Sequence, residues 1–129
     1  MYKLNLVSQA VAEELAQYIP GIPTENRVLI ISPKDVTSTN TGLIIPGQVK
    51  EGVPRKGVVL IQGEITDEYK TYKVLSQRGR VVTYGLYAGK ELEFDTDLFP
   101  TQGLKDIIND SVITVLSMNE IIYSEPNQL

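Results

Sequence analysis

The sequence predicts a mainly β fold, a small antiparallel barrel or sandwich, with one short helix at its start. Several short segments rich in Val, Ile, Thr and Tyr follow residue 23, and Gly and Pro residues separate them. Short strands at this spacing, with turn signals between them, are typical of small barrels and sandwiches. The expected strands cover residues 26–32, 56–62, 71–75, 80–87, 90–94, 111–117 and 120–124.

The helix is expected in "VSQAVAEELAQYI", residues 7–19, where apolar residues recur at helical intervals and the acidic residues face away. Ser8 or Asn5 can cap its start, and Pro20-Gly21 ends it. Such a helix could bind a partner or a membrane, or it could pack on its own domain. A membrane helix should carry basic residues on its polar face, so packing is favoured. The apolar stripe consists of Val7, Val11, Leu15 and Tyr18.

A chain of 129 residues is long enough for one domain with its own core. We expect a helical extension over residues 1–20 and a β domain over 21–129. Two segments depart from the strand pattern: the long connection 33–48, and an excursion over 95–110 that could hold a turn of helix around Leu104–Ile108. "YAGK", residues 87–90, is expected to be a tight hairpin turn.

The chain has no cysteine and no histidine, which excludes disulfides, thiol nucleophiles, His acid–base chemistry and most zinc sites. A net charge of -4 argues against non-specific nucleic-acid binding. No apolar run is long enough to span a membrane, and the start does not resemble a secretory signal. We therefore expect a cytoplasmic protein that is not an enzyme, with no catalytic residue, metal, cofactor, nucleic-acid partner or membrane partner.

Two acidic groups have ordinary interpretations. Asp95 and Asp97 are spaced like calcium ligands, but Leu98-Phe99-Pro100 follows them instead of the Gly and Glu of a calcium loop. The acidic residues within 64–68 are most simply a charged hairpin tip. Neither group predicts a catalytic or metal site.

The segment "TNTGLIIPG", residues 39–47, places three aliphatic residues between loop-forming sequences. It is either a short buried strand or a mobile loop that carries a hydrophobic anchor for a partner. Ordering a loop costs roughly 1–2 kcal/mol per residue, whereas each buried aliphatic side chain returns only about 1.5–3 kcal/mol. One such loop would bind weakly, but several on a symmetric oligomer would bind firmly.

At this point the chain resembles the GroES co-chaperonin family, the ring-shaped lids of GroEL-type chaperonins. Pro23 and Asn26-Arg27-Val28 lie where the family has its Pro and its Asp-Arg-Val. The order and spacing of several segments carry the likeness more than any single motif does. These segments are residues 22–47, 55–63, 78–85 and 113–123.

The resemblance implies an irregular antiparallel β-barrel with a mobile loop over 33–48, assembled as a seven-fold ring. It implies that the ring caps a GroEL-type chaperonin in its ATP- or ADP-bound state and encloses an unfolded client protein. Residues 64–73 would form a hydrophilic roof hairpin. The chaperonin-binding residues would be Gly42, Leu43, Ile44 and Ile45, and the subunit interface would pair Ile22, Pro23 and Thr24 with the neighbour's Ile121, Ile122 and Tyr123.

The N-terminal helix and the 95–110 excursion depart from the family pattern. Leu-Ile-Ile after Gly42 resembles the lids encoded by tailed phages, and Ala88 lies about where bacterial lids point an aromatic side chain into the chamber. These two points predict a phage-encoded co-chaperonin. The alternative is a structural β-barrel protein of a virion or another assembly, in which residues 33–48 make a fixed contact within the oligomer.

Overall fold

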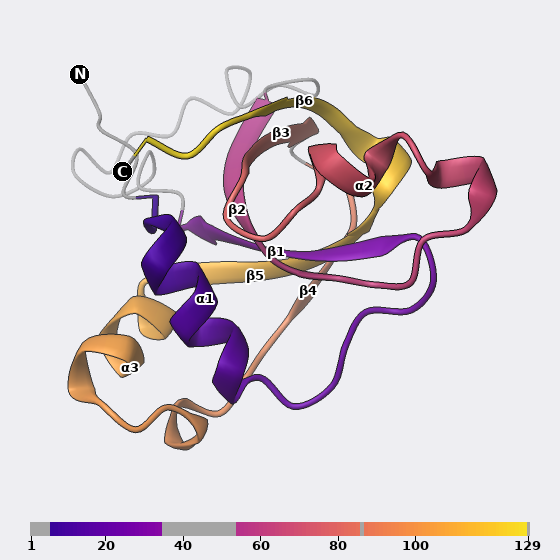
Figure 1. The fold of residues 1–129 in the computed structure, drawn as a ribbon. Helices are drawn as coiled ribbons and strands as arrows, with labels where there is room; N and C mark the ends of the chain where they lie inside the picture. The colour runs from indigo at the N-terminus through magenta and orange to yellow at the C-terminus, as the bar shows by residue number, and fades with distance from the viewer. Residues whose placement is uncertain (1–5, 35–53, 86, 129) are drawn as a thin grey trace.

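The computed structural model describes residues 6–34, 54–85 and 87–128 (Figure 1). Single-turn 3-10 helices, here labelled η2, η3 and η4, connect some of the elements. In chain order the elements are α1 (Gln9–Tyr18), β1 (Arg27–Pro33), β2 (Pro54–Gln62), η2 (Asp67–Tyr69), α2 (Tyr72–Leu75), β3 (Val81–Gly85), β4 (Lys90–Leu92), η3 (Thr96–Leu98), α3 (Gln102–Asn109), β5 (Ser111–Ser117), η4 (Met118–Glu120) and β6 (Ile121–Glu125).

The six strands form one antiparallel sheet in the order β4-β5-β1-β2-β3-β6. β2 lies near its middle and divides its pairing: Val58–Gln62 pairs with β1, and Pro54–Val58 pairs with β3. The sheet is strongly curved, and β3 and β6 curl over one of its faces (Figure 1). Its edge strands, β4 and β6, do not pair with each other in the described part of the chain. The expected antiparallel β-structure is confirmed, but the described strands form an open curved sheet and not a closed barrel.

Gly57 occupies the point where β2 changes partner. A Cβ atom at this position would collide with Ile30 Cγ2 and would lie 2.9 Å from the Ile31 carbonyl oxygen. Because β1 passes so close, only glycine fits here without displacing that strand.

Both faces of the sheet are apolar, and each is covered by helix. α1 and α3 lie on what we call the outer face, and α2 lies within the curve on the inner face (Figure 1). The buried outer cluster comprises Ala12, Leu15, Ile19, Leu29, Ile31, Val58, Leu60, Ile61, Val81, Phe99, Leu104, Ile108 and Ile113. The buried inner cluster comprises Val28, Ile30, Val59, Val82, Tyr84, Leu116 and Met118.

α1 packs on its own domain, as its acidic polar face suggested. Ser8 caps it, since the Ser8 hydroxyl accepts a hydrogen bond from the Val11 amide (3.2 Å). Ala12 and Leu15 are fully buried against the outer face of the sheet. The Tyr18 ring meets Phe99 edge-on, with 6.4 Å between the ring centroids. This last contact joins α1 to the 95–110 excursion.

The 95–110 excursion forms η3 and α3, and its helix is one turn longer than the expected Leu104–Ile108. Thr101 caps α3 by accepting a hydrogen bond from the Leu104 amide (3.2 Å). Lys105 Nζ donates to the carbonyl oxygen of Phe99 (2.7 Å) and so ties the helix to η3. Asp95 accepts a hydrogen bond from the Asp97 amide (2.9 Å), so it caps a turn as a solvated structural residue would.

The strand expected over 71–75 is wrong, because these residues form α2. The ring of Tyr72 packs against the inner cluster. Gln62 Nε2 donates to the Lys73 carbonyl (2.9 Å) and to the Ser76 hydroxyl (2.8 Å), which fixes the helical turn. The expected roof segment, residues 64–73, contains η2 and the start of α2 in place of paired strands.

The hairpin expected at 87–90 is also wrong, although the turn itself forms. The Ala88 amide donates to the Gly85 carbonyl (3.0 Å), and Gly89 has a positive φ of 74°. However, β3 pairs with β2 and β6, whereas β4 pairs with β5. The turn therefore carries the chain from one side of the curved sheet to the other.

We expect Leu15→Ala to lower the free energy of unfolding by about 2–5 kcal/mol, because it empties a fully buried site between helix and sheet. Urea denaturation at fixed protein concentration measures this change. The matched control is Glu14→Ala, at the neighbouring exposed position, which should change stability by less than about 0.5 kcal/mol. Equal effects of the two substitutions would show that α1 contributes no packing energy.

Candidate functional site

The predicted anchor residues Gly42, Leu43, Ile44 and Ile45 lie outside the described residues, but the base of their segment is described. β1 ends at Pro33 and the antiparallel strand β2 starts at Pro54, so both ends of the 35–53 segment meet the same end of the sheet. The Lys34 amide donates to the Asp110 carbonyl (3.0 Å), which fixes the first of these ends. Any group carried by this segment is therefore attached to the central strands of the domain.

β1 and β2 no longer pair with each other at the ends that join the 35–53 segment. Ser32 and Pro33 of β1 pair only with β5, and the first residues of β2 pair only with β3. The end at Pro33 is consequently held by β5, and the end at Pro54 is held by β3.

The first predicted interface segment, Ile22–Thr24, lies at the surface between α1 and β1. The Ile22 side chain is 74% exposed, Thr24 is exposed and Pro23 is half-buried. Gly63 permits close packing below them, because a Cβ atom there would collide with the Thr24 carbonyl oxygen and lie 2.9 Å from that of Pro23. The backbone of this segment therefore rests directly on the end of β2.

Asn26 fixes the chain after this segment, and it does so from a positive φ of 60°. Its side-chain oxygen accepts a hydrogen bond from the Thr66 amide (2.9 Å), and its Nδ2 donates to the Thr66 hydroxyl (3.0 Å). Its backbone amide donates to the Glu64 carbonyl (2.7 Å), and its carbonyl accepts from the Met118 amide (2.9 Å). One residue thus connects three distant parts of the chain.

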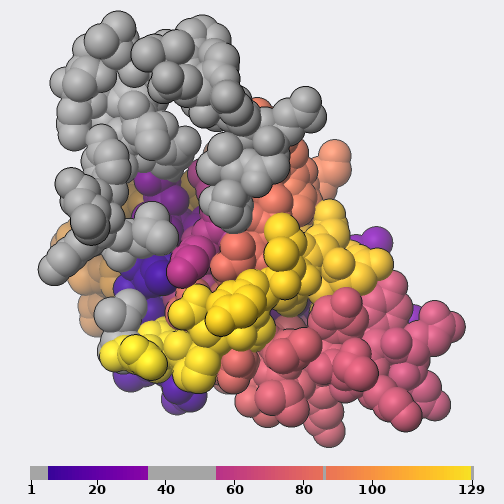
Figure 2. All heavy atoms as spheres, turned by 90° about the horizontal axis from the view of Figure 1, so that it is seen from above, coloured from indigo at the N-terminus to yellow at the C-terminus, as the bar shows by residue number. Residues whose placement is uncertain are grey.

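The second predicted interface segment is the start of β6, at one edge of the sheet. Ile121 is half-buried against the inner cluster, whereas Ile122 and Tyr123 are 69% and 60% exposed. β6 runs across the surface beside the segment that contains α2 (Figure 2). The Ser124 hydroxyl donates to the Leu75 carbonyl (2.6 Å), which fixes this neighbourhood.

The structure does not bring the two predicted interface segments together as strand partners within one chain. β6 pairs with β3, and residues 22–24 belong to no strand. Both segments nevertheless present large exposed apolar side chains, and β6 has an edge that no described strand covers.

Two features of this surface were not predicted from the sequence. Val74 and Leu75 of α2 are exposed and extend the apolar surface beside β6. The role of Asn26 was also missed, although an Asn next to a β-strand is a residue that tolerates positive φ. The exposure of Val74 and Leu75 was missed because a strand, and not a helix, was expected over 71–75.

The described residues contain no cluster of three or more His, Cys, Asp or Glu side chains that could hold a metal ion. None of the helices formed by these residues is long and apolar enough to cross a membrane.

Comparison with known proteins assigns the family. The model of the Cpn10 family, described as the chaperonin 10 kDa subunit, matches residues 21–110. This match includes β1 to β4, α2 and α3, and it leaves α1 outside.

Individual proteins agree with this match. The co-chaperonin GroES of Helicobacter hepaticus is 34% identical over 87 residues, which cover 67% of this chain and 90% of that protein. GroES of Thermotoga petrophila is 35% identical over 88 residues, with the same coverage of both chains. GroES of Porphyromonas gingivalis is 33% identical over 86 residues and 92% of its length is covered. Members of this family are co-chaperonins that assist protein folding and are not enzymes. The chain described here belongs to the Cpn10 family and is a GroES-type co-chaperonin.

Proposed function

We propose that this co-chaperonin works as a ring that caps a GroEL-type chaperonin and encloses an unfolded client protein. The observation that carries this proposal is the Cpn10 match over residues 21–110, which spans the Gly42–Ile45 anchor and its tethers. The proposed place of action is the cytoplasm, where the partner chaperonin would hydrolyse the ATP. The proposed ring is a heptamer of irregular GroES-like barrels.

The proposed binding element is a mobile loop over 33–48 whose tripeptide Leu43-Ile44-Ile45 enters an apolar groove on the chaperonin. Three aliphatic side chains return about as much free energy as a few ordered loop residues lose. A single loop is therefore a weak ligand. Several loops on one ring bind firmly, because the first contact raises the effective concentration of the others. Weak individual contacts also let the lid dissociate in each cycle.

The geometry of the base supports this proposal. Both ends of the 35–53 segment join central strands that are buried on both faces. A load on the tripeptide would therefore be transferred to the core of the domain and not to a peripheral turn.

The proposed subunit contact joins Ile22–Thr24 of one copy to Ile121–Tyr123 of its neighbour. Addition of an extended segment to an unpaired sheet edge satisfies the backbone groups of both. Ile22, Ile122 and Tyr123 are the exposed apolar side chains that such a contact would bury. Asn26 and Gly63 support the proposal, since they hold the first segment firmly against the domain.

The proposed roof is the segment around η2, where Glu64, Asp67 and Glu68 are exposed. A hydrophilic lining would favour folding of a client over its adsorption to the wall. Ala88 is half-buried against the inner cluster, and the aromatic side chain exposed beside it is that of Tyr87.

We expect Ile44→Asp to abolish capping, because a carboxylate cannot enter an apolar groove without a partner. The measurement is co-sedimentation of the lid with a GroEL-type chaperonin in the presence of ATP or ADP. Ile44→Val is the matched control and should retain at least part of the binding. The ring itself should stay assembled in both variants.

A ring that falls apart with Ile44→Asp would place the tripeptide within the fold and contradict the proposal. Backbone amide exchange distinguishes the alternative of a fixed assembly contact. The proposed loop should exchange fast in the isolated lid and become protected when chaperonin and nucleotide are added. Protection that depends only on assembly of the lid would favour the structural alternative.

We expect Ile122→Asp to dissociate the ring, because the proposed contact would bury the new charge against a neighbour. Sedimentation velocity measures the change in mass. Leu92→Asp is the matched control, since Leu92 is also partly exposed but lies on β4, at the opposite edge of the sheet. Loss of the ring with Leu92→Asp and not with Ile122→Asp would refute the proposed contact.

The tripeptide after Gly42 and the alanine at position 88 support a phage-encoded lid, which we propose as the origin of the chain. Such a lid should replace the host's own lid in the refolding of a denatured protein by host GroEL. Recovery of folded substrate measures this replacement. Failure to refold any substrate with host GroEL, while the ring is intact, would contradict the phage assignment.

A further inference from the structure

The inner face of the sheet is apolar at one end and polar at the other. At the α2 end it is lined by the apolar inner cluster. At the end where β1 and β2 diverge, the strands place polar side chains on the same face, because side chains two residues apart share a face. These are Ser32, Arg55, Tyr84, Glu91 and Thr114, from β1, β2, β3, β4 and β5.

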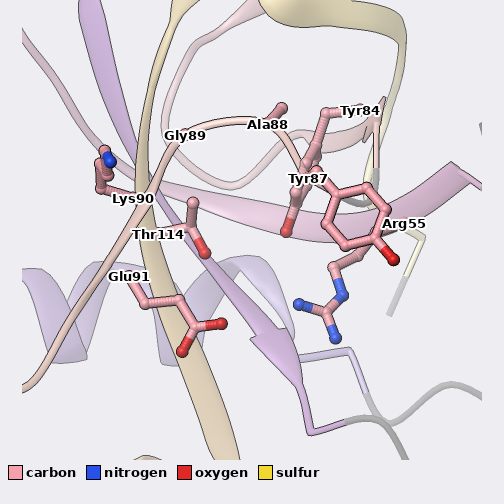
Figure 3. Close-up of a pocket in the computed structure, with 8 residues that line it drawn as sticks. All are labelled: Arg55, Tyr84, Tyr87, Ala88, Gly89, Lys90, Glu91 and Thr114. Carbon is pink, nitrogen blue, oxygen red and sulfur yellow. The ribbon is translucent and has the colours of Figure 1, made fainter. Parts of the chain in front are cut away.

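The polar end of this face contains a hollow of about 270 Å³, closed on one side by the turn that precedes β4 (Figure 3). Its volume is far above the roughly 10–15 Å³ that holds one water molecule. Figure 3 shows the hydroxyls of Tyr84 and Thr114, the guanidinium of Arg55 and the carboxylate of Glu91 directed toward this space. The Lys90 amino group, in contrast, points away from it.

The Tyr84 hydroxyl is the strongest sign that the hollow is a site. The residue is 1% exposed, and its oxygen is the one buried side-chain polar atom without a hydrogen-bond partner among the described residues. Burial raises the pKa of Tyr84, and the neighbouring Ser32 and Thr114 hydroxyls and the Arg55 charge partly offset this, although neither hydroxyl has the geometry of a hydrogen bond to the phenol. The phenol is therefore neutral near pH 7 and has a proton to donate. A buried hydrogen-bond donor without an acceptor lowers the stability of the fold by about 1–3 kcal/mol. A ligand that accepts a hydrogen bond from the Tyr84 hydroxyl would recover this free energy.

The charge of the site selects the class of ligand. Among the described residues, the ion pair that forms joins Lys56 to Glu125 (3.3 Å). Arg55 therefore has no carboxylate of these residues within ion-pairing distance. The guanidinium, the phenol and the Thr114 hydroxyl are all hydrogen-bond donors, and Glu91 is the only charged acceptor among the described residues that line the hollow. Forked donors from arginine match the oxygens of carboxylates and phosphates.

We propose that this hollow binds a small oxyanion, a carboxylate or a phosphate group, held by Arg55 and the Tyr84 hydroxyl. Thr114 supplies a further donor, and Glu91 weakens the binding through repulsion. The described residues that line the hollow all belong to one chain, so the proposal can be tested on the lid without a chaperonin.

The test is thermal unfolding of the intact protein in inorganic phosphate or acetate, with sodium chloride of equal ionic strength as the reference. A bound ligand raises the unfolding temperature in a saturable way. We expect such a rise with phosphate, acetate or both, and the stronger of the two identifies the source of the oxyanion. Arg55→Met and Tyr84→Phe should each weaken the apparent affinity about ten-fold, as expected for loss of a charge-assisted or buried hydrogen bond.

Two further variants make the result decisive. Lys56→Met removes a neighbouring positive charge from the opposite face of β2 and should leave the affinity unchanged. Glu91→Gln should raise the affinity, because it removes the repulsion. Without ligand, Tyr84→Phe should unfold at the same temperature as the parent protein or higher, since it removes only the unpaired hydroxyl. The proposal is overturned if neither probe raises the unfolding temperature beyond the chloride reference, or if Lys56→Met weakens binding as much as Arg55→Met.

Discussion

Strand β2 pairs through its two halves with two different neighbours, and the rest of the fold depends on this division. Its second half pairs with β1 and its first half pairs with β3. The change of partner bends the sheet, and it requires Gly57, because any side chain would collide with β1 at that point. The curvature creates an inner face, where the apolar cluster and the polar hollow lie, and an outer face that needs a separate cover.

α1 and α3 provide that cover together. The outer face carries buried aliphatic side chains from β1, β2, β3 and β5, and an exposed surface of this kind would favour aggregation. The Cpn10 match begins at residue 21, so α1 is an addition to the part of the chain that defines the family. The edge-on contact of Tyr18 with Phe99 shows that α1 also packs against the 95–110 segment, which lies within the match.

Much of the architecture follows from local sequence patterns. The strands at 26–32, 56–62 and 111–117 formed close to their predicted bounds because most of their β-branched residues are buried on the sheet. The strand at 120–124 also formed, although Ile122 and Tyr123 are exposed. The α1 helix and its Ser8 cap were also predictable. The error at 71–75 has a clear cause: Tyr72 packs into the inner cluster and Gln62 binds the helical turn, and neither contact is visible in the local pattern.

Pairing between strands and the surface sites were harder to predict. The sequence places β3 and β4 next to each other, but their partners come from opposite sides of a curved sheet. The partnership of Asn26 with Thr66 spans 40 positions and has no local signature. The hollow around Tyr84 draws on four strands and a turn, so it exists only after the sheet has curved. The anchor tripeptide and the interface residues rest on resemblance and remain predictions.

The separate anchoring of the two ends of the 35–53 segment has a mechanical consequence. If both ends were fastened to one shared ladder, traction from a tethered partner would open that ladder one bond at a time. Here Pro33 is held by β5 and the start of β2 is held by β3. A pull on this segment would thus be split between two ladders on opposite flanks, and the domain should withstand the repeated engagement and release that the proposed capping requires.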